Sequence, residues 1–273
     1  MRELRGKVCV ITGSGSGIGR ALALELARRG ARLAVSDLNG DAAAATAQAC
    51  GAAGAPQVES YRLDVSDRDA VFAHADEVRA GFETVNLVVN NAGVAMHQDV
   101  LETTIEDYEW IMGINFWGVV HGTKAFLPHL IGSGNGHVVN ISSLFGLIAV
   151  PSESGYNASK FAVRGFTEAL RQEMLLARHP VGVSCVHPGG IRTSIARSAR
   201  VPGGDSTEVA TSFEKIARLS PEEAARIIVR GVERGRPRIL VGGDARAVDL
   251  LQRVLGSGYQ QLVYRAVSRI EGR

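Results

Sequence analysis

The chain has 273 residues, of which 45% are hydrophobic and 21% are charged, and its formal net charge is +2. This length and composition suit one globular domain with a sizeable core, because single α/β domains commonly reach about 250 residues. The near-neutral charge gives no sign of nucleic acid as a partner, and no segment has the roughly 18 consecutive apolar residues of a membrane span.

Three cysteines, Cys9, Cys50 and Cys185, are odd in number and far apart in the chain. Their spacing matches no metal-binding motif, so no metal site is expected. Cys9 and Cys185 stand inside apolar runs, as buried thiols do in a reducing compartment. The first residues lack the apolar core and cleavage site of a secretory leader. We therefore expect a cytoplasmic protein.

In chain order, short apolar runs rich in β-branched residues alternate with longer segments of helical periodicity. The short runs predict strands over residues 7–12, 32–37, 57–64, 85–93, 136–143, 181–190 and 238–243. The longer segments predict helices over 19–30, 40–53, 66–80, 104–131, 154–178 and 221–234. Strands that are apolar throughout are typical of a parallel sheet covered by helices on both faces. The sequence thus predicts an α/β fold, a Rossmann-type doubly wound seven-stranded parallel sheet in a single domain with a C-terminal helical extension.

Two segments break this alternation. Residues 194–220 contain no predicted strand, and we interpret them either as a lid or as a disordered loop. Residues 244–273 predict two amphipathic helices that are interrupted at 256–258, with arginines interspersed. This extension packs on the core or on a sister subunit, or else it anchors the protein weakly to a membrane surface.

The stretch ITGSGSGIGR, residues 11–20, lies between the first predicted strand and the first helix. In an α/β sheet this turn can hold a diphosphate on backbone amides and the helix N-terminus. The pattern G-x-G-x-x-G does not fit, because Ile18 stands where its last glycine would be. The pattern T-G-x-x-x-G-x-G does fit, through Thr12, Gly13, Gly17 and Gly19. It resembles the single-domain branch of the short-chain dehydrogenase/reductase family, in which Gly15 falls on a variable position and is expected to be dispensable.

The resemblance implies a nicotinamide dinucleotide cofactor. Asp37 ends the second predicted strand, where a carboxylate can accept hydrogen bonds from the hydroxyls of an adenosine ribose and repel a 2′-phosphate. Ser16 and Leu38 occupy positions at which NADP-binding members carry a basic residue, so we expect NAD. NADP is less favoured, although Arg20 is close to the phosphates, and Asp37 alternatively only starts the following turn. The full set of residues that the resemblance assigns to the cofactor is Gly13, Ser16, Gly17, Ile18, Gly19, Asp37, Leu38, Asp64, Val65, Asn91, Ala92, Gly93, Tyr156, Lys160, Pro188, Gly189, Ile191 and Thr193.

Tyr156 and Lys160 are four residues apart at the start of a predicted helix, so their side chains share one face. An ammonium group, together with the positive charge of an oxidised nicotinamide, favours the phenolate and makes Tyr156 a general acid/base. Such a pair also occurs by chance on many helices. The family pattern adds a serine thirteen residues earlier that holds the substrate oxygen, which is Ser143 with Ser142 as the adjacent alternative. It also adds Asn115, whose backbone would hold a proton-relaying water, whereas an ordinary buried asparagine is the simpler interpretation.

These motifs together predict an NAD-dependent short-chain alcohol dehydrogenase or ketoreductase, with residues 1–243 as its NAD-binding catalytic domain and 244–273 as an extension of the same domain. We expect residues 194–215 to close a largely apolar pocket lined by Val94, Ala95, Met96, Leu144, Phe145 and Val150. The predicted substrate is therefore a bulky hydrophobic alcohol or ketone of steroid, terpenoid, retinoid-like or aryl type, as in a hydroxysteroid dehydrogenase. Glu153 either hydrogen-bonds a distal substrate hydroxyl or caps the helix.

Two other functions are compatible with a dinucleotide-binding fold. A non-catalytic sensor or scaffold would keep the fold without the chemistry, but the complete set of four catalytic positions favours an enzyme. A sugar-nucleotide epimerase or dehydratase is disfavoured, because the family's longer branch resembles G-x-x-G-x-x-G and has a larger C-terminal domain. The resemblance also implies a homodimer or homotetramer assembled through the helix that bears Tyr156 and its neighbour.

Overall fold

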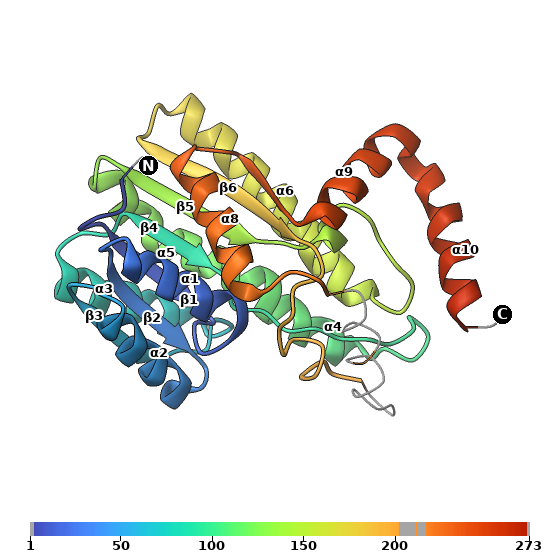
Figure 1. Cartoon of the computed structure of the whole chain (residues 1–273), viewed down its shortest axis with the longest axis horizontal. Helices are drawn as coiled ribbons and strands as arrows, with labels where there is room; N and C mark the ends of the chain where they lie inside the picture. The colour runs from blue at the N-terminus through green and yellow to red at the C-terminus, as the bar shows by residue number, and fades with distance from the viewer. Residues whose placement is uncertain (1–2, 202–210, 212–216, 272–273) are drawn as a thin grey trace.

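The sheet has the predicted architecture in the computed structural model, which describes residues 3–201, 211 and 217–271. Seven parallel strands lie in the order β3-β2-β1-β4-β5-β6-β7 (Figure 1). Their bounds are β1 (Val8–Thr12), β2 (Arg32–Asp37), β3 (Val58–Arg62), β4 (Leu87–Asn90), β5 (Gly136–Ile141), β6 (Val181–Pro188) and β7 (Arg238–Val241). The strand order reverses between β1 and β4, and ligands of such sheets bind at the carboxyl ends of the strands beside this reversal.

The helices begin where the local sequence supplies a cap. Asn39, Asp67, Thr104 and Ser220 each accept a backbone N–H at the start of the helix that follows. The helices are α1 (Gly17–Arg28), α2 (Gly40–Ala52), α3 (Arg68–Phe82), α4 (Ile105–Met112), α5 (Gly118–Gly132), α6 (Ser154–Leu176), α8 (Pro221–Glu233), α9 (Gly243–Leu255) and α10 (Tyr259–Glu271). Most bounds lie within two or three residues of the predicted ones, because caps and apolar periodicity act locally.

The helix predicted over 104–131 is not uniform, which corrects the sequence prediction. A π-helical turn, η1 (Gly113–Trp117), joins α4 to α5, and the Gly118 N–H donates to the Gly113 carbonyl. A π turn holds one residue more than an α turn, and such turns often occur at functional sites. The apolar periodicity of the sequence does not reveal a single extra residue. Asn115, one of the predicted site residues, lies within this turn and is buried.

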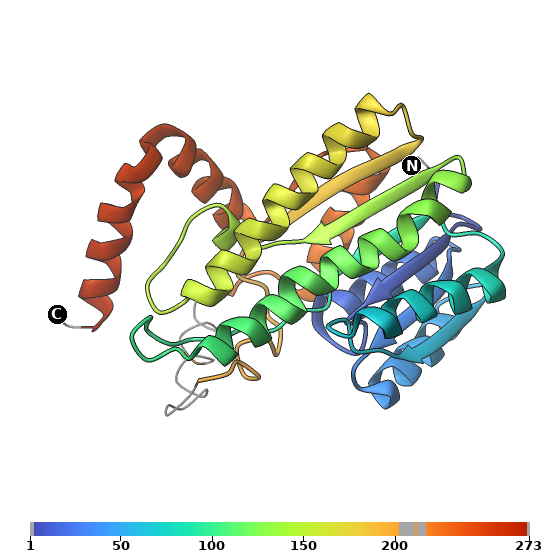
Figure 2. The same cartoon turned by 180° about the vertical axis from the view of Figure 1, so that it is seen from behind.

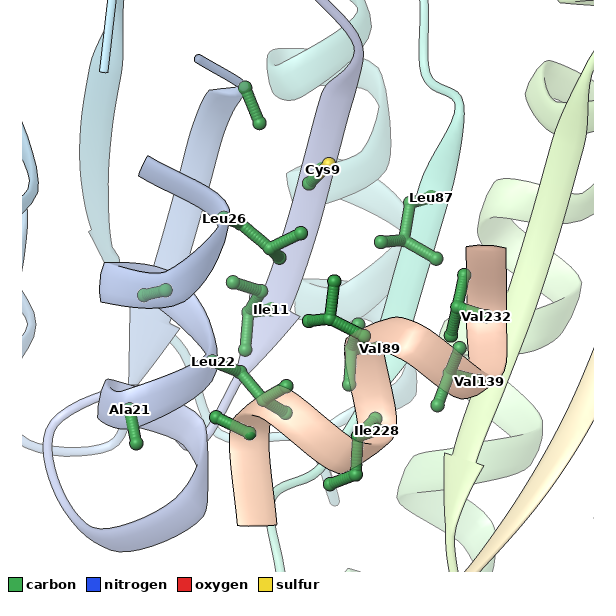
Figure 3. Close-up of a cluster of buried hydrophobic side chains, with 14 of the residues drawn as sticks. Cys9, Ile11, Ala21, Leu22, Leu26, Leu87, Val89, Val139, Ile228 and Val232 are labelled. Atoms are coloured by element: carbon green, nitrogen blue, oxygen red, sulfur yellow. The ribbon is translucent and has the colours of Figure 1, made fainter. Parts of the chain in front are cut away.

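Helices cover both faces of the sheet. Figure 1 shows α1, α2 and α8 on one face, and Figure 2 shows α3, α5 and α6 on the other. In Figure 3 the apolar side chains of α1 and α8 meet those of the central strands, among them Leu22, Leu26, Ile228, Ile11 and Val89. Each such buried side chain contributes about 1.5–3 kcal/mol of hydrophobic stabilisation. The two packed faces leave the carboxyl ends of the strands as the place where loops can form a site.

The C-terminal extension is helical, with the break where it was predicted. Helix α9 is followed by the 3₁₀ turn η3 (Gly256–Gly258) and by α10, which projects away from the sheet (Figures 1 and 2). None of the helices among the described residues is long and apolar enough to cross a membrane. Much of the predicted lid, including its Pro-Gly-Gly turn at 202–204, lies outside the described residues.

Candidate functional site

Three glycines shape the turn between β1 and α1. Gly13 has a φ of +64°, and a Cβ there would lie 2.7 Å from the Cα of Ala92. A Cβ on Gly19 would lie 2.1 Å from the carbonyl oxygen of Gly13. Gly17 has a φ of +51°, and its Cβ would lie 3.2 Å from Cγ2 of Thr193. The glycines therefore let the turn fold on itself and pack against the end of β4.

Gly15 has little room for a side chain, although the sequence analysis treats it as dispensable. Its N–H donates to Oδ2 of Asp37 over 2.8 Å. A Cβ on Gly15 would lie 2.7 Å from Cβ of Ala42 and 2.9 Å from that same carboxylate oxygen. The family pattern treats the position as variable, but in this chain a side chain there would displace Asp37 or α2.

The N-terminus of α1 has no side-chain cap. Ser16 occupies the N-cap position, and its side chain makes no capping hydrogen bond. A cavity of about 640 Å³ opens beside Gly17 at this helix end. Its charged lining residues are Arg20, Arg192, Arg197 and Glu222. Uncapped helix amides and an excess of arginine suit an anionic group such as a diphosphate.

Asp37 lies at the carboxyl end of β2 with both oxygens engaged. Oδ2 accepts from Gly15, and Oδ1 accepts from the N–H of Asn39 over 3.0 Å. Asp37 thus starts the following turn, as one of the two interpretations held. A carboxylate has about four lone-pair sites, so each oxygen still has room for a ribose hydroxyl. Leu38, the next residue, is exposed.

Asn91 and Ala92 fasten the glycine turn to the end of β4. The Asn91 side-chain amide donates to the carbonyls of Thr12 and Gly13 over 2.9 and 3.1 Å. The hydroxyl of Thr12 accepts from the N–H groups of Asn91 and Ala92. The polar atoms of these residues therefore hold the shape of the turn.

Asp64 and Val65, two of the residues predicted to bind the cofactor, follow β3. Asp64 is exposed, and its Oδ1 accepts from the backbone N–H and the hydroxyl of Ser66. Val65 is buried, and a Cβ on Gly118 would lie 2.8 Å from its Cγ2. Val65 therefore packs on α5 while Asp64 stays at the rim of the sheet.

The turn after β6 connects the far end of the sheet to the glycine turn. The Gly189 N–H donates to the Val241 carbonyl over 2.9 Å, which joins the turn to β7. Ile191 is buried, whereas Thr193 lies against Gly17. The segment that was predicted to contact the cofactor thus connects β7 to the start of α1.

Tyr156 and Lys160 lie in the first turns of α6, as predicted. The Lys160 Nζ is 5.5 Å from the centroid of the Tyr156 ring and donates to the Ile141 carbonyl over 3.2 Å. Burial raises the pKa of Tyr156 to about 12, while a hydrogen bond with Ser143 acts in the opposite direction. Burial lowers the pKa of Lys160 to about 8. The chain alone therefore does not produce the lowered tyrosine pKa that was expected, and further positive charge is needed to favour the phenolate.

The structure distinguishes the two candidate serines. Ser143 contacts Tyr156, and its Oγ also accepts from the N–H of Phe145 over 3.1 Å. Ser142 is buried, and its hydroxyl donates to the carbonyl oxygen of Lys160 over 2.8 Å. Ser143 therefore faces the tyrosine, while Ser142 ties the end of β5 to α6.

Asn115 links the loop after β4 to α6. Its Oδ1 accepts from the Val94 N–H over 2.8 Å, and its Nδ2 donates to the Val94 carbonyl over 2.9 Å and to the Ser159 hydroxyl over 3.1 Å. A Cβ on Gly93 would lie 3.1 Å from Oδ1 of Asn115 and 3.3 Å from Nζ of Lys160. Asn115 is thus a buried asparagine whose side-chain oxygen and nitrogen both have hydrogen-bond partners, and it also lies beside Lys160.

The sequence analysis missed His187, which lies just behind Ser143. Its Nδ1 is 2.9 Å from the Ser143 carbonyl oxygen. Burial lowers the pKa of His187 to about 4, so the ring is neutral at pH 7, and its Nδ1–H donates because a carbonyl can only accept. The only signal in the sequence is one histidine at the end of an apolar strand.

Glu153 lies at the start of α6 but does not cap it, and its carboxylate contacts another side chain. It occupies the N-cap position without a side-chain capping bond, which overturns the capping interpretation. Its Oε1 lies 3.1 Å from Nδ1 of His97, a residue that the sequence analysis also missed. Burial raises the pKa of Glu153, and the contact with His97 opposes this change. A partly exposed carboxylate thus lies three residues before Tyr156.

One of the predicted pocket residues belongs to the core. Met96 is 1% exposed, and a Cβ on Gly155 would lie 2.6 Å from its terminal methyl group, so Met96 packs beneath the start of α6. The expectation failed because chain position does not reveal the direction of a side chain. The other apolar candidates are half-buried: Val94, Ala95, Leu144, Phe145 and Val150.

A doubly wound sheet with a glycine turn, and a serine, a tyrosine and a lysine together at its carboxyl edge, is typical of oxidoreductases with a Rossmann-type fold. The family model described as short chain dehydrogenase matches residues 7–202. The chain therefore belongs to the short-chain dehydrogenase family, and it is an oxidoreductase of that family.

Proteins similar to this chain include several with known names. SadH of Mycobacterium tuberculosis is 58% identical over 98% of both chains. Epidermal retinol dehydrogenase 2 of Mus musculus is 36% identical over 85% of this chain and 72% of its own. Estradiol 17-beta-dehydrogenase 11 of Rattus norvegicus is 31% identical over 98% of this chain and 86% of its own. A short-chain dehydrogenase/reductase from Burkholderia phymatum, solved in complex with NAD, has a TM-score of 0.86 and 33% identity over 93% of this chain and 95% of its own.

Proposed function

We propose that the protein is an NAD(H)-dependent dehydrogenase that interconverts a hydrophobic secondary alcohol and its ketone. The observation that carries the proposal is the convergence of Ser143, Tyr156 and Lys160 at the carboxyl edge of the sheet. Ser143 lies in the loop after β5, and Tyr156 and Lys160 lie in α6, beside the loop that follows β4. A substrate hydroxyl held at this point can give its proton to Tyr156, whose own hydroxyl is buried and hydrogen-bonded to Ser143.

Each residue has a separate role in the proposed reaction. Tyr156, as a phenolate, takes the hydroxyl proton of the alcohol, and it returns this proton in the reverse direction. The Ser143 hydroxyl donates a hydrogen bond to the substrate oxygen as negative charge develops on it. Lys160 supplies positive charge near the phenolate and binds the cofactor ribose. Asn115 holds the loop after β4 beside Lys160, where a water could carry the proton onward.

A bound oxidised nicotinamide would accept the hydride and add the positive charge that favours the phenolate. The site fits a dinucleotide because the N-terminus of α1 is uncapped and arginines line the adjoining cavity. The Asp37 carboxylate, with the exposed apolar Leu38 beside it, supports NAD, since a 2′-phosphate would meet a negative charge. Arg20 is the one argument for NADP, because it lines the cavity beside Gly17.

The proposed substrates are bulky and apolar. Support comes from the half-buried Phe145, whose ring makes an edge contact with Tyr156 at 6.2 Å between ring centroids. Leu144, between Ser143 and Phe145, and Val94, whose backbone bonds to Asn115, are also apolar and half-buried. Two relatives are named for retinol and estradiol, which are alcohols of this kind. We further propose that residues 1–243 form the catalytic domain, and that the protein works in the cytoplasm, where its three cysteines, all buried and free, would stay reduced.

The assembly is proposed to be a homodimer or homotetramer through α5 and α6. Large apolar side chains are exposed on α6 and just before α5: Phe161 at 39% and Leu176 at 85% on α6, and Trp117 at 51% at the end of η1. An exposed apolar surface of this kind usually forms an interface with another protein chain. Light scattering should give a mass of two or four chains, and Trp117→Arg should lower it, whereas a monomeric wild type would contradict the proposal.

The test of the function is the formation of NADH, followed by absorbance, with a panel of hydrophobic secondary alcohols. We expect turnover with NAD and much less with NADP, and Tyr156→Phe should lower kcat/KM by about 10²–10⁴-fold while the variant still binds NADH. Tight NADH binding without turnover of any alcohol would instead favour the dinucleotide sensor.

A further inference from the structure

The C-terminal extension contacts the turn that follows β6. Asp244, in the first turn of α9, accepts from the Gly190 N–H through Oδ2 over 2.6 Å. Its Oδ1 accepts from the N–H of Ala245 over 2.9 Å, at the start of its own helix. The carboxylate therefore joins the N-terminus of α9 to the turn that is predicted to contact the cofactor.

Two glycines make room for this carboxylate. A Cβ on Gly189 would lie 2.1 Å from both oxygens of Asp244, and a Cβ on Gly242 would lie 2.3 Å from Oδ1. Gly242 also has a φ of +107°, which side chains rarely adopt. The backbone on both sides of the contact is thus fitted around the acidic group.

The extension has a second contact, with the loop between Ser143 and Tyr156. Tyr259, the first residue of α10, is buried, and its hydroxyl oxygen accepts from the Ala149 N–H over 3.0 Å. The adjoining Val150 carbonyl accepts from the side chain of Asn157 in α6. Tyr259 is therefore attached to the loop that carries the substrate-facing residues.

We propose that the C-terminal extension is a positioning element of the active site, in which Asp244 fixes the turn after β6 and Tyr259 fixes the loop after β5. Asp244 and Tyr259 are 15 residues apart and are joined by α9, whose 13 residues extend about 20 Å at 1.5 Å per residue, and by the turn η3, so this part of the extension connects the two loops. This inference rests on the proposed function for its effects on binding, but the two hydrogen bonds themselves can be tested without any ligand.

The first test is amide hydrogen exchange of the full-length protein without ligand. Asp244→Ala should increase exchange at least about tenfold in the peptide covering 188–193, and Tyr259→Phe should do so in the peptide covering 147–153. Asp244→Asn keeps one acceptor oxygen and should fall between Asp244→Ala and the wild type. Unchanged exchange in both peptides, or an increase spread over the whole chain, would overturn the proposal.

The second test separates the two contacts by their effects on ligands. Asp244→Ala should raise the Kd for NADH about tenfold, measured by NADH fluorescence. Tyr259→Phe should raise the KM for the best alcohol several-fold and leave the NADH Kd unchanged. Asp69→Ala in the first turn of α3 and Tyr264→Phe, 65% exposed on α10, are matched controls without these contacts.

The outcomes keep this inference apart from the proposed function. A wild type that neither binds NADH nor oxidises an alcohol contradicts the function, and the exchange test still decides on the two contacts. A wild type that does both, together with variants that alter the same parameter equally, contradicts the separate roles of Asp244 and Tyr259.

Discussion

The cofactor side and the substrate side of the site are built in different ways. On the cofactor side, the shape of the turn depends on glycines, which have no side chain. At Gly13, Gly15 and Gly19 an added Cβ would lie within 3 Å of another atom. On the substrate side, the shape depends on side chains that pair across long stretches of sequence. His187 is hydrogen-bonded to Ser143, 44 residues earlier in the chain, and Tyr259 to Ala149, 110 residues earlier.

This difference explains what substitutions should do on each side. An atom added to a close-packed turn must displace backbone, so its effect is large and structural. A hydrogen-bonding side chain removed from the substrate side leaves the fold in place and changes a position or a pKa. The following predictions test this contrast, beginning with the largest expected effect.

Gly19→Ala should destabilise the protein by about 3 kcal/mol or more, because its Cβ would lie 2.1 Å from the Gly13 carbonyl oxygen. Urea unfolding followed by circular dichroism measures the free energy of unfolding. The matched control is Gly132→Ala at the end of α5, where an added Cβ would meet nothing within 4 Å. Equal stability of the two variants would contradict a sterically closed turn.

Ser143→Ala and Ser142→Ala should separate chemistry from stability. Ser143→Ala should lower kcat/KM by about 10²–10³-fold with little change in unfolding free energy. Ser142→Ala should instead lower stability by about 1 kcal/mol, since its buried hydroxyl donates to the Lys160 carbonyl. Enzyme kinetics and urea unfolding of both variants check this, and the opposite pattern would show that the two serines have been assigned the wrong way round.

His187→Gln should make the protein less sensitive to acid. Burial lowers the pKa of His187 to about 4 from an ordinary value near 6.5, so only the unfolded chain takes up this proton as the pH falls between these values. The stabilisation is thus complete above pH 6.5 and is lost towards pH 4. Between pH 7.5 and 5, the variant should lose about 2 kcal/mol less unfolding free energy than the wild type.

The exposed His179 provides the matched control for this experiment. His179→Gln should follow the wild type at both pH values. His74 and His137, whose pKa values burial also lowers, to about 4 and about 3, should leave the His187→Gln protein with a remaining acid sensitivity. An identical loss in the wild type and in His187→Gln would mean that His187 is not buried as a neutral ring.

Gly15→Ala should raise the KM for NAD several-fold and leave kcat nearly unchanged. The new Cβ would lie 2.9 Å from the Asp37 oxygen that Gly15 now binds, so the carboxylate must move away from the ribose site. Steady-state kinetics with NAD and with NADP measures the effect. An unchanged KM would restore the sequence expectation that Gly15 is dispensable.

Local sequence was sufficient for much of the fold and for the core of the site. Alternating apolar runs predicted the seven strands, and the spacing of Tyr156 and Lys160 predicted that they share one face of α6. The extra residue in the π turn around Asn115 was not predictable, because it leaves the apolar periodicity almost intact. The partners of Ser143 and Glu153 come from distant strands and loops, and only the tertiary structure brings them together.

Glu153→Gln should have the smallest effect, a shift of the pH profile by less than about one unit. The Glu153 charge contributes to raising the pKa of Tyr156, so its removal should lower that pKa. Alcohol oxidation needs the phenolate, and the acid limb of kcat/KM should therefore move to lower pH. Glu173→Gln, on the exposed face of α6, is the matched control and should leave the profile in place.

The same variant distinguishes the other interpretation of Glu153. If the carboxylate binds a distal hydroxyl, Glu153→Gln should raise the KM of hydroxylated alcohols relative to that of plain ones, without moving the pH profile. A pH profile that moves equally for both kinds of alcohol would show instead that Glu153 acts on the pKa of Tyr156. Because removal of the Glu153 charge can only lower the pKa of Tyr156, a shift to higher pH would contradict both interpretations.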